Sequence, residues 1–148
     1  DTYHLLLMDQ LSDSRDKRLS AIAQKSIKEV RYHYRFSSEW MKRLGDGTPL
    51  SKQKMQDAVN ELYRFTGELF EATPIEIEMA DQGFGPDVSA LQAEYHNRVQ
   101  AVIDEAGLTL PETPWHQSGG KKGIHGEHLG YILADLQYMQ RAYPNMQW

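Results

Sequence analysis

The sequence contains no cysteine among its 148 residues. This absence excludes disulfides, thiolate metal ligands and thiol nucleophiles, and it is typical of proteins in reducing compartments. Long apolar runs are also absent: the longest, Leu5 to Met8, is far shorter than the roughly 20 residues that a membrane-spanning helix needs, and no basic-then-apolar leader precedes it. We therefore expect a cytoplasmic protein without a membrane partner.

The chain has fewer basic than acidic residues. Sixteen Lys and Arg residues stand against 21 Asp and Glu residues, which gives a formal charge of -5. This is the wrong sign for a protein that binds phosphate backbones over a broad face, so nucleic acid is not an expected partner. The length and the hydrophobic content of 40% suit one compact domain over residues 1–148.

Helix start and stop signals divide the chain into helical segments. We predict them at residues 1–11, 16–44, 50–70, about 87–106 and 124–143, with the first already running at Asp1. Residues 71–86 and 108–123 are predicted loops, and the alternation at residues 75–78 allows a short extended piece there. No sheet is expected, so the predicted fold class is all-α.

The segment 16–44 carries one stripe of residues at steps of three and four, which predicts an inward face. Its members are Leu19, Ile22, Ser26, Glu29, His33, Phe36, Trp40 and Leu44. Glu29 and His33 are polar groups on this stripe, and burying them costs free energy unless they are paired. The pattern therefore predicts an internal polar cluster that contains His4, Glu29, Tyr32 and His33.

Inward carboxylates and histidines in a helical bundle suggest a di-iron protein, in which two helices each supply a Glu-x-x-His pair. No such pair occurs here: Tyr32 stands three residues after Glu29, and the nearest approach is Asp1-x-x-His4. We therefore predict no metal and no catalytic residue in this chain. The alternative is a partial site in which Asp1, His4, Glu29 and His33 join groups from outside the chain.

Two further groups of residues suggest binding. Lys121 and Lys122 lie in a glycine-rich loop before a helix start near His128, where backbone amides and two cations could contact a partner or a coenzyme A phosphate. The full phosphate-loop spacing is absent, so a solvated loop is the simpler interpretation. Lys25, Lys28, Arg31 and Arg35 form a basic strip on the long segment, which suits either an acidic partner or an ordinary solvated face.

Several separate blocks of sequence resemble one family, the C subunits of bacterial phenylacetyl-CoA epoxidases. In chain order they are Ser14–Asp16, Lys28–His33, Arg43–Thr48, Ser118–Gly123, Glu127–Gly130 and Leu136–Arg141. The resemblance covers essentially all 148 residues. It implies a ferritin-like bundle whose first core helices, N-terminal in the family, are missing from this chain.

The resemblance also implies a role. In that family the A subunit holds the di-iron site that epoxidises the aromatic ring of phenylacetyl-CoA, a reductase delivers electrons from NADPH, and the C subunit is a structural scaffold. The expected partners are the catalytic A subunit, the missing N-terminal segment and the other epoxidase components, including the reductase. The alternatives are a catalytic di-iron subunit and a free-standing helical module that binds an acyl-CoA.

Overall fold

The computed structural model describes residues 1–112 and 115–147. Within these residues every regular element is helical, which confirms the predicted all-α class. The chain divides into two compact units, residues 1–118 and residues 119–148, and each is described by itself. The single domain predicted over residues 1–148 stays a prediction. None of the described helices is long and apolar enough to cross a membrane.

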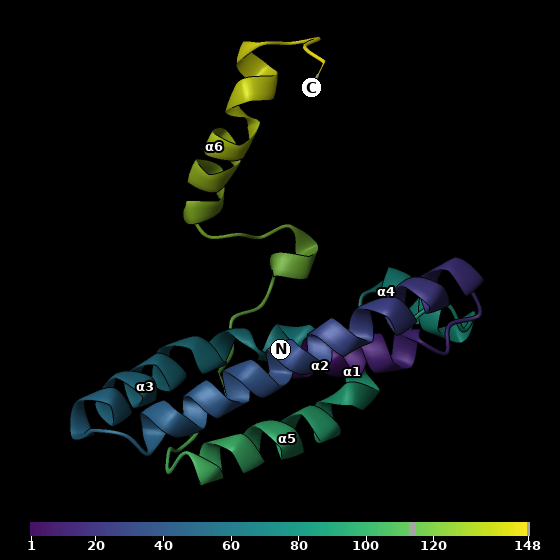
Figure 1. Cartoon of the computed structure of the whole chain (residues 1–148). Coiled ribbons are helices and arrows are strands. Elements are labelled where there is room, and N and C mark those ends of the chain that lie inside the picture. Colours follow the sequence, from purple (N-terminus) through teal and green to yellow (C-terminus); the bar gives the residue numbers. More distant parts are fainter. Residues whose placement is uncertain (113–114, 148) are drawn as a thin grey trace. The chain divides into compact units, whose positions relative to one another are not determined.

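The longest helix is α2 (Lys17–Gly45), and its ends follow the predicted signals (Figure 1). The Asp16 carboxylate accepts hydrogen bonds from the backbone N–H groups of Arg18 and Leu19, at 2.8 and 3.1 Å, which satisfies two donors that the first turn leaves free. After a short turn, Thr48 caps α3 (Pro49–Leu62) through a 3.1 Å bond from the Ser51 N–H. The two predicted helix starts are therefore confirmed.

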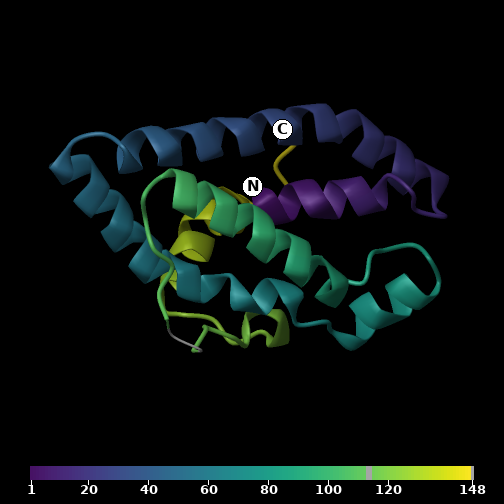
Figure 2. The same cartoon turned by 90° about the horizontal axis from the view of Figure 1, so that it is seen from below.

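The core of residues 1–118 lies where α1 (Thr2–Leu11), α2, α3 and α5 (Gln92–Glu105) meet. Figures 1 and 2 show α1 and α5 running alongside α2, with α3 turning back from its C-terminal end. The buried apolar residues form three clusters: Leu5, Ile27 and Val30; Leu6, Phe70, Leu91 and Tyr95; and Val59, Ile103, Ala106 and Leu108. Burial of such side chains is the main stabilising contribution to the fold.

The predicted helix 50–70 is interrupted. It stops at Leu62, and two 3₁₀ turns, Tyr63–Phe65 and Gly67–Phe70, replace its last two turns. The physical reason is competition for carbonyl groups: the Thr66 hydroxyl donates to the Tyr63 carbonyl at 2.8 Å, and the Gln117 N–H donates to the Arg64 carbonyl at 2.8 Å. The i to i+4 ladder therefore does not continue.

The predicted loop 71–86 contains a helix, α4 (Pro74–Asp81), so the extended piece allowed at residues 75–78 is wrong. A capping box starts this helix: the Thr73 hydroxyl accepts from the Glu76 N–H at 3.3 Å, and the Glu76 carboxylate accepts from the Thr73 N–H at 2.7 Å. Pro74 adds a first-turn residue with a fixed φ. These local contacts outweigh the strand-like alternation.

The second unit contains a 3₁₀ turn at Gly120–Lys122 and the last helix, α6 (His128–Ala142). Helix α6 begins four residues later than predicted. The predicted loop 108–123 is otherwise confirmed for its described part, and residues 113 and 114 of that loop lie outside the described residues. Within this unit the α6 side chains are exposed apart from a partly covered Leu129.

Candidate functional site

Helix α2 buries a side that lies about a third of a turn away from the predicted stripe. Its buried residues are Ser20, Ala23, Ile27, Val30, Ser38 and Gly45. Ile27 and Phe36 are nine residues apart, which at about 100° per residue places them on opposite sides of the helix. Phe36 is accordingly exposed, as are Ile22 and Trp40. The helix is apolar on two sides. The sequence pattern selected the side that this chain leaves mostly uncovered, with Leu19, Ser26 and Leu44 half-buried at its edge.

The four residues of the predicted polar cluster are all exposed in this chain. On α2, the His33 Nε2 atom lies 3.9 Å from the Glu29 Oε1 atom, and the Tyr32 ring contacts the His33 ring edge-on at 6.1 Å between centroids. His4 lies on α1, and no contact joins its side chain to these three in the described structure. The structure therefore brings three of the four residues together, Glu29, Tyr32 and His33, and the enclosure of the cluster in a complete subunit stays a prediction.

The stripe continues as a ladder of aromatic rings along α2. The centroids of Tyr32 and Phe36 are 6.2 Å apart, and those of Phe36 and Trp40 are also 6.2 Å apart. Their exposed fractions are 54%, 53% and 44%, so about half of each ring faces solvent. We call Ile22, Tyr32, Phe36 and Trp40 the aromatic face of α2. Tyr32, Phe36 and Trp40 follow one another along this face, and an exposed apolar surface of this kind marks a contact site.

Two arginines flank this face. The guanidinium of Arg35 lies 5.8 Å from the centroid of the Tyr32 ring, and that of Arg43 lies 5.7 Å from the centroid of the Trp40 ring. Both contacts are within the range of cation–π attraction. Tyr, Trp and Arg are the residue types that dominate binding energy in protein interfaces, so the composition also indicates a contact surface.

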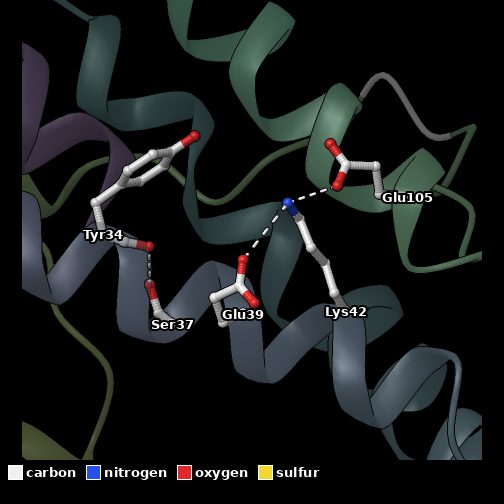
Figure 3. A network of polar contacts seen from close by, with 5 residues as sticks. All are labelled: Tyr34, Ser37, Glu39, Lys42 and Glu105. Atoms are coloured by element: carbon white, nitrogen blue, oxygen red, sulfur yellow. Dashed lines mark hydrogen bonds and ion pairs between the residues drawn. The ribbon is translucent and has the colours of Figure 1, made fainter.

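A polar network joins α2 to α5 on another side of the helix (Figure 3). The Lys42 Nζ atom lies 2.6 Å from the Glu105 Oε2 atom of α5 and 3.9 Å from the Glu39 Oε1 atom. The hydrogen bond to Glu105 is the main reason why the pKa of Lys42 is raised above its usual value. The neighbouring Ser37 hydroxyl donates to the Tyr34 carbonyl at 3.2 Å. The ion pair between Lys42 and Glu105 thus links α5 to α2.

An apolar cavity of about 350 Å³ lies between α2, α3 and α5. Its walls include Met41, Met55, Val59 and Val99, and Tyr95, whose pKa is raised because the ring is buried. Asp1 is the one carboxylate among the lining residues. In residues 1–112 and 115–147, no three His, Asp or Glu side chains converge as a metal site would require. The donor set therefore does not fit a di-iron centre, which needs several carboxylates with histidines.

The predicted anion contacts lie in the second unit. Gly119 and Gly123 have φ of 101° and 82°, a region that favours glycine, and the Gly119 carbonyl accepts from the N–H groups of Lys122 and Ile124, both at 2.9 Å. Lys121 and Lys122 are exposed in this turn, and His128 is the exposed first residue of α6. The glycines thus shape a tight turn, while anion binding by these side chains stays a prediction.

Sequence reasoning missed the contacts that join distant segments. The spacing of Glu39 and Lys42 is visible in the sequence, but the partner Glu105 lies on another helix. His116 likewise contacts Glu71, with 2.9 Å between Nε2 and Oε1, across 45 residues of sequence. No local pattern signals either pair.

The described residues thus form an all-α protein with an exposed aromatic face on its longest helix. The chain belongs to the family of phenylacetic acid catabolic proteins, whose model matches residues 1–148. It is similar to the C subunit of 1,2-phenylacetyl-CoA epoxidase from Escherichia coli, with 49% identity over 148 residues. The match covers 100% of this chain and 60% of the relative, so the chain spans less than two thirds of that protein.

Proposed function

We propose that this chain is part of a non-catalytic C subunit that scaffolds the catalytic A subunit of a phenylacetyl-CoA epoxidase. The single observation that carries the proposal is the 49% identity to the C subunit of such an epoxidase along the whole of this chain. In this proposal the A subunit holds the di-iron site that epoxidises the aromatic ring, and a reductase supplies electrons from NADPH. The chain acts in the cytoplasm in aerobic phenylacetate degradation.

The side chains of this chain support a structural role. A catalytic subunit would have to gather carboxylates and histidines around two metal ions. Here Glu29 and His33 form an exposed pair on α2, and His4 lies exposed on a different helix, α1. The ion pair between Lys42 and Glu105 instead joins two helices. These contacts support a structural role rather than a catalytic one.

Reconstitution of the complex tests the proposal. The full-length subunit is co-expressed with the catalytic subunit, and the yield of complex and the turnover per complex are measured for Glu29→Gln and for a matched control, Glu61→Gln, on the exposed surface of α3. We expect turnover per assembled complex to stay at the wild-type level in both. Normal assembly of Glu29→Gln with abolished turnover would overturn the scaffold role and favour a catalytic one.

A further inference from the structure

We propose that the basic strip of α2, formed by Lys25, Lys28, Arg31 and Arg35, is a docking surface for an acidic face of the reductase that delivers electrons to the epoxidase. The inference rests on the proposed function, which supplies the reductase as a component of the complex. It goes further in assigning one surface of this chain to that partner.

The strip occupies a side of α2 that is neither apolar nor buried. Ile27, on the buried side, and Phe36, on the aromatic face, point in opposite directions. At about 100° per residue, Lys28 and Arg35 each lie about a quarter of a turn from both. The four cations are exposed, and they extend about 15 Å along the axis from Lys25 to Arg35, at about 1.5 Å per residue. The strip is therefore a separate surface of the helix.

The charge of α2 contrasts with that of the rest of the chain. The helix contains eight Lys or Arg residues and two Glu residues, a balance of +6. The whole chain carries -5, so the residues outside α2 carry -11. Positive charge is thus concentrated on one helix of an acidic protein. This arrangement attracts an anionic surface to α2, whereas a long polyanion such as nucleic acid would be repelled by the remaining surface.

The distribution of cations on α2 opposes the stability of the helix. The strip residues follow one another at steps of three and four, so each lies beside the next like charge, and such pairs weaken a helix. After the cap at Asp16, the first turn contains Lys17 and Arg18 and no acidic residue, although the positive end of the helix dipole favours negative charge there. Departures of this kind from the rules of helix stability are expected at functional surfaces.

The strip has little compensating negative charge within the chain. Neither Lys25 nor Lys28 forms an ion pair with any of the described residues. Arg31 lies 3.7 Å from Asp9, but both side chains are 60% exposed, and an ion pair so open to solvent is weak. Arg35 contacts an aromatic ring rather than a carboxylate. The positive charge of the strip is therefore available to a partner.

The composition of the strip favours a transient partner over a permanent subunit. The centre of a permanent interface is depleted in charged residues, whereas the strip consists of them. Exposed charges mainly speed the encounter of two proteins, and redox partners associate through small interfaces. In the proposed epoxidase the reductase is the component that associates repeatedly to deliver electrons. The strip therefore fits a reductase with an acidic docking face.

A coenzyme A phosphate fits the strip less well. A phosphate is bound by donors that converge on one anion, as backbone amides do at a helix N-terminus. The four cations of the strip are instead spread over about 15 Å of a helix surface. An extended row of charge matches an extended acidic surface, such as that of a protein.

Steady-state kinetics of the reconstituted epoxidase tests the inference. Turnover driven by NADPH is measured against reductase concentration for the wild-type full-length subunit and for Lys25→Glu/Lys28→Glu. The control, Lys52→Glu/Lys54→Glu, makes the same change in charge at exposed sites on α3. We expect the strip variant to raise the KM for reductase about tenfold with kcat unchanged, and the control to leave both unchanged. Raising the salt from about 50 to about 300 mM should raise the wild-type KM several-fold and that of the strip variant much less.

Four results would overturn the inference. An equal KM for reductase in the wild type and the strip variant means that the strip does not dock the reductase. An equal rise in both variants reflects net charge rather than the strip. A lower yield of assembled complex in the strip variant assigns the strip to the catalytic subunit. A raised KM for phenylacetyl-CoA, with that for reductase unchanged, assigns the strip to the substrate phosphates.

Direct binding separates this inference from the proposed function. The isolated full-length subunit, without the catalytic subunit, is passed over immobilised reductase at low salt. We expect the association rate constant of the strip variant to be about tenfold below those of the wild type and the control, because exposed charges act mainly on the encounter rate. Normal assembly of the epoxidase without binding of the wild-type subunit to reductase would overturn the inference alone. Binding to reductase without assembly would contradict the proposed scaffold role and leave the docking surface intact.

Discussion

The close approach of α2 to the end of α5 gives a prediction that depends on a single methyl group. Gly45 is the buried last residue of α2, and a Cβ atom built on it would lie 2.9 Å from the Ala106 Cβ atom and closer still to the Ala106 carbonyl oxygen. Because the carbonyl belongs to the backbone, the two segments must separate. Overpacking of this kind costs about 1–3 kcal/mol.

The net effect of Gly45→Ala is smaller than that cost, because alanine is favoured over glycine in helices by up to about 1 kcal/mol. We expect a loss of about 1–2 kcal/mol in the free energy of unfolding, or about 4–8 °C in melting temperature for a unit of this size. Urea denaturation followed by circular dichroism measures it. The control is Gly130→Ala in α6, where a Cβ atom meets nothing within 4 Å. Unchanged or increased stability of Gly45→Ala would refute the reasoning.

Two further predictions concern local contacts. Thr73→Ala removes the cap of α4, and we expect a loss of about 1 kcal/mol in the local stability of this helix. The loss should appear as roughly fivefold faster amide hydrogen exchange in residues 76–81. Unchanged exchange would contradict the capping box. The pKa of Lys42 in the folded protein is raised above its usual value of 10.5. The bond to Glu105 therefore stabilises the fold fully at a pH below 10.5, and this stabilisation is lost as the pH rises through the pKa of the folded protein. The difference in urea midpoint between wild type and Lys42→Met should therefore be constant from about pH 7 to 9 and shrink above about pH 10.5; a difference that does not change with pH would contradict the ion pair.

The sequence predicts helix ends well where the signal is local. Asp16 and Thr48 cap the helices predicted to begin near residues 16 and 50, and their side-chain oxygens bond N–H groups only two or three residues away. The capping box of Thr73 and Glu76 is also a local signal. It was not recognised in the sequence, because residues 75–78 alternate in the way that is typical of a strand. The break after Leu62 was not predicted, because only one of its two contacts, from the Thr66 hydroxyl, is local, while the other comes from Gln117, which is distant in sequence.

In the candidate site, too, local patterns were predicted from the sequence and contacts between helices were not. The three- and four-residue steps correctly placed Phe36, Trp40 and Glu29 on one side of α2, but periodicity does not say which of two apolar sides meets the described core. That choice depends on Ile27 and Val30 packing against α1, a contact between separate helices. Likewise the pairing of Lys42 with Glu105 needs the tertiary fold.

The iron content of the full-length subunit purified alone tests the scaffold role most directly. Elemental analysis after dialysis, with the catalytic subunit as positive control, is compared for wild type and Glu29→Ala. The account predicts far less than one iron per chain in both, because a scaffold subunit would not hold the di-iron site. About one or two irons per chain in the wild type, retained on dialysis and lost in Glu29→Ala, would contradict it.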